Sequence, residues 1–230
     1  YDRARQRNNP QDFCGHVAGY ALVDFSFPAG TRFPCLPVDT PYGLIFPLEG
    51  ESLCTAPEIE LALSMGAHLD IRWGFTIPWM ARDEVLTRSQ AVISKMQRKR
   101  IDTWREKHPV PVAVTSDDVG YRLFEPFTTA IRDNRAKYRR KTLPFEFNKL
   151  LGNSAYGKIG QGYKDKRAYG PREQDYVPIG PSRISDPGLA ALVCGFVRAV
   201  LGEILSKIPP DIDVISATTD GFLVGCPLEQ

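Results

Sequence analysis

Residues 149–157 combine side chains and spacings that suit a ligand bearing phosphate groups. Their stretch is helix-forming, and at about 100° per residue one side of the helix collects Lys149, Gly152, Asn153, Tyr156 and Gly157. Lys149 and Asn153 lie one turn apart, so an ammonium stands beside an amide. The two glycines leave gaps where a flat group could approach the backbone. Because a mid-helix glycine costs about 1 kcal/mol relative to alanine, the pattern favours binding over a purely structural helix.

The opposite side of this helix is apolar and is expected to pack against other parts of the protein. The helix is expected to begin at Pro144, since proline fits a first helical turn. A glycine-rich loop, Lys158 to Gly162, follows it. A dinucleotide site on this loop is one interpretation, but no strand precedes the glycines, which disfavours it. The apolar side comprises Phe147, Leu150, Leu151 and Ser154.

Asp220 is the second chemical candidate, in a Thr218-Thr219-Asp220-Gly221 turn between two short apolar runs. The runs predict a β-hairpin whose strands, Val214-Ile215 and Phe222-Leu223-Val224, are both buried. A carboxylate held rigidly at such a tip can bind Mg²⁺. Asp-Gly is also the commonest signal of a tight hairpin turn, so the turn alone leaves a purely structural interpretation open.

Basic residues are concentrated in one segment of the 230-residue chain. The total net charge is +2, yet between Arg132 and Arg172 twelve basic residues accompany three acidic ones, a local charge of +9. This asymmetry indicates a polyanionic partner, although a solvated pair of basic helices would have the same composition.

The overall composition indicates a globular protein without a zinc or redox motif. Hydrophobic residues make up 43% and charged residues 24%, which excludes wholesale disorder. The five cysteines include no C-x-x-C pair, and the three histidines are scattered. The longest uninterrupted apolar run, Leu189 to Val193, is too short to cross a bilayer, so no membrane partner is expected.

The first part of the chain predicts strands around one short helix. Short strands and turns are expected from His16 to Phe46, and a further strand from His68 to Ile77. Between them, Thr55 to Glu58 has the spacing of a capping box that begins a helix. A polar, helix-prone segment from Asp83 to Lys107 follows. Strands and helices in this order predict an α+β fold.

The second part predicts two helices, a loop or short hairpin, and a long apolar helix. A helix from Tyr121 to Lys141 and the helix at Pro144 form an αα-hairpin with a basic tip. Asp186 begins the long helix and Pro209-Pro210 ends it. Its expected buried stripe comprises Leu189, Leu192, Val193, Phe196, Val197, Val200, Leu201, Ile204 and Leu205.

Together these motifs resemble those of family B DNA polymerases. Lys149 to Gly157 matches the family's K-x-x-x-N-S-x-Y-G element, motif B, at every defined position. The turn ending at Gly221 takes the place of the D-T-D-S element, motif C, with Thr218 at its first aspartate and Asp220 at the second, metal-binding one. The D-x-x-(S/A)-x-Y-P element, motif A, does not occur here and is expected to precede Tyr1. The short fingers are most similar to the protein-primed and primer-independent branches of phages, plasmids and mobile elements.

The resemblance implies a fold and a division of the chain. The fold would be an α+β polymerase palm, an antiparallel sheet with helices on one face, with a two-helix fingers hairpin, as a fragment of a larger polymerase. Residues 1–120 would form the first part of the palm. Residues 121–160 would form the fingers with motif B, and residues 161–230 the second part of the palm with the long helix and motif C.

The implied activity is template-directed DNA synthesis in the replication of a virus, plasmid or mobile element. Two Mg²⁺ ions, with Mn²⁺ as a possible substitute, would promote nucleotidyl transfer to a primer 3′-hydroxyl. The implied partners are template and primer DNA, deoxynucleoside triphosphates and, in the protein-primed branch, a terminal protein. The implied location is the cytoplasm of a bacterial or host cell.

The resemblance also assigns roles to residues. Asp220 would be the catalytic metal ligand, Lys149 and Lys137 would neutralise the triphosphate, Asn153 would add a hydrogen bond, and Tyr156 would pack against the nascent base pair. The chain by itself is expected to be inactive without motif A. A non-catalytic nucleic-acid-binding remnant of such a polymerase is the alternative, prompted by the missing motif A and the altered motif C. Contacts along the template strand are expected from Ser154, Gly157, Lys158 and Gln161.

Overall fold

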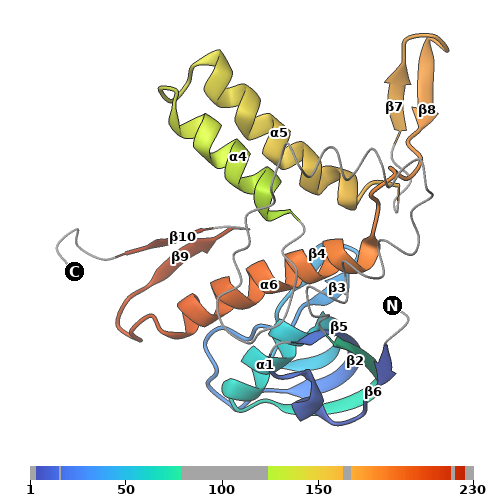
Figure 1. The fold of residues 1–230 in the computed structure, drawn as a ribbon. Coiled ribbons are helices and arrows are strands. Elements are labelled where there is room, and N and C mark those ends of the chain that lie inside the picture. Colours follow the sequence, from blue (N-terminus) through green and yellow to red (C-terminus); the bar gives the residue numbers. More distant parts are fainter. Residues whose placement is uncertain (1–3, 16, 79–123, 163–166, 219–220, 226–230) are drawn as a thin grey trace. The chain divides into compact units, whose positions relative to one another are not determined.

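The computed structural model describes residues 4–15, 17–78, 124–162, 167–218 and 221–225 (Figure 1). The chain is a mixture of antiparallel strands and four α-helices within these ranges. It divides into two compact units, one formed by residues 1–78 and 187–230 and the other by residues 79–186. The division into palm and fingers segments stays a prediction, and the helix expected at Asp83–Lys107 lies outside the described residues.

The first unit is built on a four-stranded antiparallel sheet in the order β1-β6-β2-β5. The long central strand β2 pairs with β5 on one side and with β6 on the other. The strands expected from His16 onward and from His68 onward are therefore confirmed. A small separate ribbon pairs β3 (Val38–Thr40) with β4 (Gly43–Ile45). The strands of the main sheet are β1 (Arg5–Gln6), β2 (Val17–Ser26), β5 (Glu49–Thr55) and β6 (His68–Pro78).

Helix α1 (Ala56–Ser64) covers one face of this sheet (Figure 1). It begins with the predicted capping box, because the Glu58 carboxylate accepts a hydrogen bond from the Thr55 backbone N–H at 2.8 Å. Ile59 on α1 and Phe13 at the end of a 3₁₀ turn are fully buried in the core between helix and sheet. The sequence signals for a helix at this point are thus confirmed.

Helix α6 (Pro187–Ser206) packs against α1 through small residues rather than through its large apolar ones. Gly195, Ala199, Gly202 and Leu205 are its buried residues. The prediction of a packed stripe of large side chains is confirmed at Leu205 but wrong at several other positions, because α1 approaches α6 closely. A Cβ atom at Gly202 would already lie 3.1 Å from the Leu61 side chain. Several large members of the expected stripe are exposed instead: Val193, Phe196, Val197, Val200 and Ile204.

Helix α6 is also long and apolar enough to cross a membrane, judged by length and composition alone. It is the one helix of this kind among the described residues, and a core helix of a soluble protein passes the same test. An arginine in its middle, Arg198, is bound to the buried Glu58 of α1. That ion pair fits a helix that packs within a folded unit.

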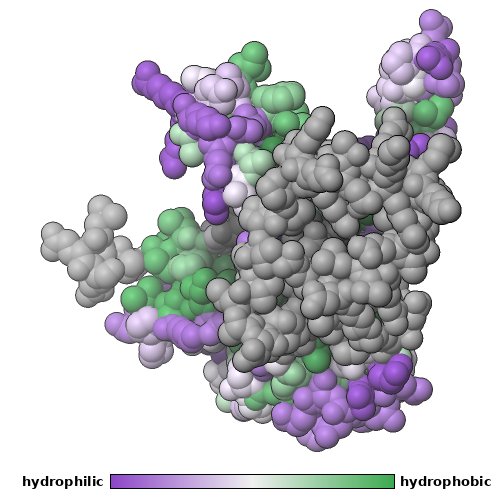
Figure 2. All heavy atoms as spheres, in the orientation of Figure 1, coloured by the Kyte–Doolittle hydropathy of each residue, from purple (hydrophilic) through white to green (hydrophobic). Residues whose placement is uncertain are grey.

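The chain after α6 forms the predicted hairpin of β9 (Val214–Ala217) and β10 (Phe222–Val224). The expected burial of both strands was wrong, since Ile215 and Leu223 are 64% and 56% exposed. Figure 2 shows hydrophobic side chains on the surface of this hairpin. A two-stranded ribbon satisfies its main-chain hydrogen bonds but supplies no second layer to cover either face.

The second unit contains the predicted αα-hairpin, formed by α4 (Glu125–Ala136) and α5 (Leu143–Ile159). Helix α5 has Pro144 in its first turn, as expected. Helix α4 ends before the predicted Lys141, whose φ of +68° cannot continue a right-handed helix. After α5, a short ribbon of β7 (Arg167–Gly170) and β8 (Asp175–Pro178) occupies the region expected to be loop or hairpin.

Candidate functional site

Lys149 and Asn153 are both exposed on α5, one turn apart. The nearest ionic partner of Lys149 is Glu146, with 4.0 Å between Nζ and Oε2, and the lysine side chain is about half exposed. The ammonium and the amide are therefore accessible from solvent on the same helix. This arrangement can bind an anionic oxygen through a charged donor and a neutral donor.

Of the expected binding face, Gly152 and Tyr156 line a cavity between α4 and α5, whereas Lys149 and Asn153 do not. A Cβ atom at Gly152 would lie 3.5 Å from Ile131, an ordinary contact, and one at Gly157 would meet nothing within 4 Å. Neither glycine is therefore required by packing in the described structure.

The apolar side of α5 does not pack as predicted. Leu150 is 63% exposed and Phe147 is 56% exposed, and Leu151 and Ser154 are exposed as well. The side facing α4 is instead the one that bears Phe145, Gly152 and Ile159. These residues recur every seven positions, about two helical turns, so they lie along one seam where two helices can pack. Hydrophobicity on the helical wheel identified an apolar side but not the one that α4 covers.

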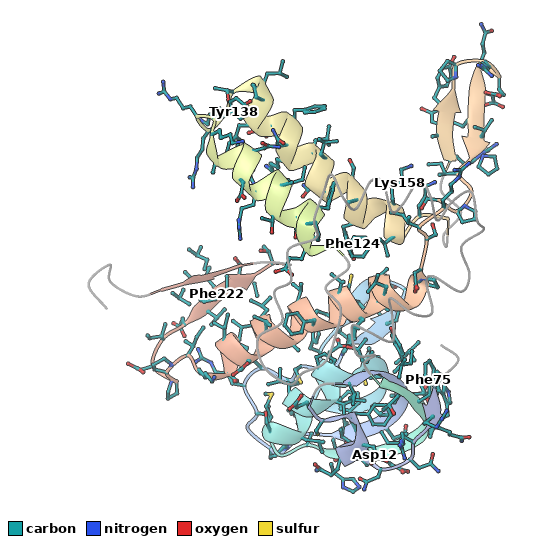
Figure 3. All side chains as sticks on the ribbon, viewed as in Figure 1. Asp12, Phe75, Phe124, Tyr138, Lys158 and Phe222 are labelled. Atoms are coloured by element: carbon teal, nitrogen blue, oxygen red, sulfur yellow. The ribbon has the colours of Figure 1, made fainter. Side chains whose placement is uncertain are left out.

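The cavity between α4 and α5 has a volume of about 940 Å³ and was not anticipated from the sequence. Figure 3 shows Tyr138 at the tip of the helical hairpin, with Phe124 and Lys158 toward its opposite end. Arg135 lies over the Phe145 ring, with 4.4 Å from Cζ to the ring centroid, and its buried Nε has no hydrogen-bond partner. The signal that could have indicated this cavity was the row of Phe124, Phe127, Ile131 and Tyr138, which follows helical spacing in and next to α4 and lines the cavity.

Lys158 and Gln161, expected on the template strand, are bonded to each other at the end of α5. Lys158 Nζ donates to Gln161 Oε1 at 2.6 Å, and Gln161 Nε2 donates to the Gly180 carbonyl at 2.7 Å. The hydroxyls of Ser182 and Ser185 bind the Lys158 and Gln161 carbonyls at 2.6 and 2.8 Å. These bonds satisfy carbonyl groups that a helix end leaves free, so the end of α5 is fixed by the segment that follows it.

The other expected ligand-binding positions are exposed. Lys137 lies at the end of α4, and its Nζ donates to Asn134 Oδ1 at 3.0 Å. Ser154 and Gly157 lie on α5 and are exposed. The structure therefore presents these residues on the surface of the helical hairpin, and Lys137, Lys149 and Asn153 do not line the cavity between α4 and α5.

Asp220 lies outside the described residues, but the turn on either side of it is described. The Thr218 N–H donates to the Gly221 carbonyl at 2.7 Å, and its hydroxyl donates to the same oxygen at 3.1 Å. Thr218 thus closes the turn where the related motif has an aspartate. Within the ranges that the structure describes, no group of three or more His, Cys, Asp or Glu residues could hold a metal ion.

A buried ion pair between α1 and α6 was also missed by the sequence reasoning. Glu58 is fully buried, and its Oε1 accepts a hydrogen bond from Arg198 Nε at 2.7 Å. Burial and the Glu58 charge together raise the pKa of the Cys35 thiol to about 12 and raise that of Cys54 as well. The detectable signal was Arg198, an arginine in the middle of a largely apolar helix.

Comparison with known proteins finds similarity along the whole chain to one curated protein. The chain is 41% identical over 231 residues to the primer-independent DNA polymerase PolB of Escherichia coli. The match covers all of this chain and 23% of that protein, so the chain spans about a quarter of the relative's length. Among solved structures, phi29 DNA polymerase matches 92% of this chain and 32% of its own, at 11% identity and a TM-score of 0.49. No protein-family model matches the chain.

Proposed function

Because the chain belongs with the family B DNA polymerases, as its motif and its similarity to a primer-independent polymerase indicate, we propose that it forms part of the core of a template-directed DNA polymerase. The reaction would transfer a nucleotide to a primer 3′-hydroxyl by two-metal catalysis, in the replication of a virus, plasmid or mobile element. DNA and deoxynucleoside triphosphates would be its partners, and the cytoplasm its location. A terminal protein would serve as primer only in a protein-primed enzyme.

The observation that supports this proposal most strongly is the nine-residue motif on α5. A motif match needs the right structural context, and here it falls on a helix whose Lys149 and Asn153 are exposed. A solvent-facing ammonium and amide are what recognition of a triphosphate requires. The basic segment between Arg132 and Arg172 supports a polyanionic partner for the same unit.

In this proposal the side chains of the helical hairpin bind and orient the incoming nucleotide. Lys149, with Lys137, neutralises the β- and γ-phosphates, and Asn153 donates to a phosphate oxygen. Tyr156 packs against the nascent base pair. The DNA backbone is contacted by four template-side positions, Ser154, Gly157, Lys158 and Gln161. The hydrogen bonds that Lys158 and Gln161 make hold this edge of the site in one conformation.

Asp220 is the residue through which the proposed enzyme would bind magnesium. The closed turn between Thr218 and Gly221 fits a carboxylate presented at a fixed tip, and a carboxylate is a suitable Mg²⁺ ligand. The described residues add no further acidic cluster, so carboxylates from elsewhere in the polypeptide would complete the site. Bound Mg²⁺ would neutralise the triphosphate and activate the primer hydroxyl.

The test is primer extension by the full-length polymerase that contains this chain, with Asp220→Asn compared with wild type. The variant retains the shape and turn preference of the residue but loses its charge, so extension should fall by several orders of magnitude while DNA binding is unchanged. Asp211→Asn, the same change at an exposed position before β9, should leave extension intact. Full activity of Asp220→Asn would contradict the metal assignment.

A non-catalytic DNA-binding remnant is the second candidate function. The observation that favours it is Thr218, which lacks the charge of the family's first motif C aspartate. This alternative predicts that wild-type full-length protein binds DNA, with no extension at any Mg²⁺ or Mn²⁺ concentration. Any templated extension that depends on Asp220 would exclude it.

A further inference from the structure

The two oxygens of the Glu58 carboxylate accept hydrogen bonds from different elements. Oε2 accepts hydrogen bonds from the N–H and the hydroxyl of Thr55, both at 2.8 Å, and so completes the N-terminal cap of α1. Oε1 accepts the bond from Arg198 Nε of α6 at 2.7 Å. The carboxylate is fully buried, and the Arg198 side chain is 28% exposed. One buried group thus joins the start of α1 to the middle of α6.

Apart from the Arg198–Glu58 bond, the contact between α1 and α6 is made mostly by small residues. Gly195 lies directly against Thr55 and Glu58, where a Cβ atom would be 2.0 and 2.6 Å from their side-chain oxygens. The residues of α6 that are buried against α1 are mostly glycine and alanine, which have no branched side chains to interlock. A helix that slid by one turn would move about 5.4 Å. The Arg198–Glu58 bond is directional, so together with the close fit of Gly195 it favours one register of α6 over the others.

The β9–β10 hairpin follows α6 after a short link, and this link is held by Arg32 from the segment between β2 and β3. Arg32 donates through Nη1 to the Pro209 carbonyl at 2.9 Å and through Nη2 to the Ile212 carbonyl. The Gly225 N–H then closes the base of the hairpin on the Asp213 carbonyl at 2.9 Å. A shift of α6 therefore either breaks these bonds or moves the hairpin.

We propose that Glu58 and Arg198 are positioning residues that set the register of α6 and, through it, the position of the hairpin that bears Asp220. This inference rests on the function proposed above. A buried ion pair contributes little net stability compared with apolar side chains of similar size, but it can specify one arrangement among several. Catalytic groups must be held within about 0.5 Å of their productive geometry, so a small change of register would affect catalysis.

The test uses the full-length polymerase and three variants: Arg198→Met, Glu58→Gln/Arg198→Met, and Lys207→Met as control. Arg198→Met leaves Glu58 buried without its cation and should lower both stability and kcat. The double variant removes the buried charge as well, so the thermal transition should rise again toward wild type. Lys207 pairs with Glu203 on the exposed last turn of α6, and its loss should change neither quantity.

The expected result for the double variant is a kcat ten- to a hundredfold below wild type, since a misplacement of about 1 Å can cost a hundredfold. KM for the nucleotide and Kd for DNA should stay within about threefold. The inference is overturned if kcat recovers together with thermal stability, because the pair would then be only structural. Suppose that the wild type extends DNA, that Asp220→Asn abolishes extension, and that both Arg198 variants retain full kcat. In that case only this inference fails, and the proposed function stands. If wild type extends no DNA, the proposed function fails and this inference with it.

Discussion

Substituting Gly195 by alanine tests how closely α6 lies against α1. A Cβ atom at this position would lie 2.0 Å from Thr55 Oγ1 and 2.6 Å from Glu58 Oε2. Both residues are almost completely buried, and the Thr55 hydroxyl donates a hydrogen bond to Glu58 Oε2, so neither oxygen can swing away. Because real Cβ contacts are not shorter than 3.0 Å, the helix must move by at least about 1 Å.

The expected cost follows from three contributions. Overpacking a tight contact costs about 1–3 kcal/mol. Displacing Arg198 from Glu58 would remove a charged hydrogen bond, which contributes about 1.5–3 kcal/mol. Alanine gains about 1 kcal/mol over glycine in a helix interior. The free energy of unfolding should therefore decrease by about 3 kcal/mol, which lowers Tm by about 6–12 °C in a chain of this length.

Urea unfolding of Gly195→Ala, monitored by circular dichroism, measures this change. Gly202→Ala on the same helix is the comparison, because its added Cβ would meet the flexible end of Leu61 at 3.1 Å and should cost less. Gly157→Ala, where nothing lies within 4 Å, should be neutral or stabilising. If Gly195→Ala were as stable as Gly157→Ala, the close approach of α6 to α1 would be refuted.

Three further results are expected. In the full-length protein, Lys149→Ala should raise the apparent KM ten- to a hundredfold for all four nucleotides alike, because a phosphate contact does not distinguish bases. Steady-state extension with each nucleotide in turn measures this, and a defect for one base alone would contradict it. DNA affinity of the 230-residue chain should fall steeply between low and moderate salt in fluorescence-anisotropy titrations, since the +9 segment releases counterions on binding; affinity independent of salt would remove the electrostatic argument. The raised pKa values of Cys35 and Cys54 predict a contribution to the free energy of unfolding that depends on pH. It is complete below pH 9.0, where the thiols are protonated in the unfolded chain as well. It decreases as pH rises from about 9 toward 12, because the unfolded thiols then lose their protons before the folded ones do. Urea unfolding at several pH values should show this decrease in wild type and a smaller one in Cys35→Ala/Cys54→Ala.

Local signals in the sequence predicted where elements begin and what type they are. The capping box at Thr55 and Glu58 begins α1, and Pro144 lies in the first turn of α5, because both effects depend only on neighbouring residues. Motif B was recognised from nine consecutive residues for the same reason. Lys149 and Asn153 lie one turn apart, which helical geometry alone determines.

What the sequence could not predict was which face of each element would be covered. Several large apolar residues of α6, such as Phe196, are exposed, because the closest approach of α1 is occupied by small residues such as Gly195 and Ala199. Hydrophobicity alone ranks phenylalanine above glycine for burial, whereas a close helix contact reverses that order. The Glu58–Arg198 pair escaped prediction because its members are 140 residues apart in sequence.

The wide separation of Glu58 and Arg198 has a consequence for folding during synthesis. The first unit is discontinuous, because residues 79–186 belong to the other unit. Translation at about 5–20 residues per second would deliver Arg198 roughly 7–28 s after Glu58. During that interval α1 can cap itself through Thr55, but its buried carboxylate has no cation and the contact with α6 does not exist. The first unit can therefore reach its native core only late in translation, whereas the contacts between α4 and α5 can form as soon as these helices have been made.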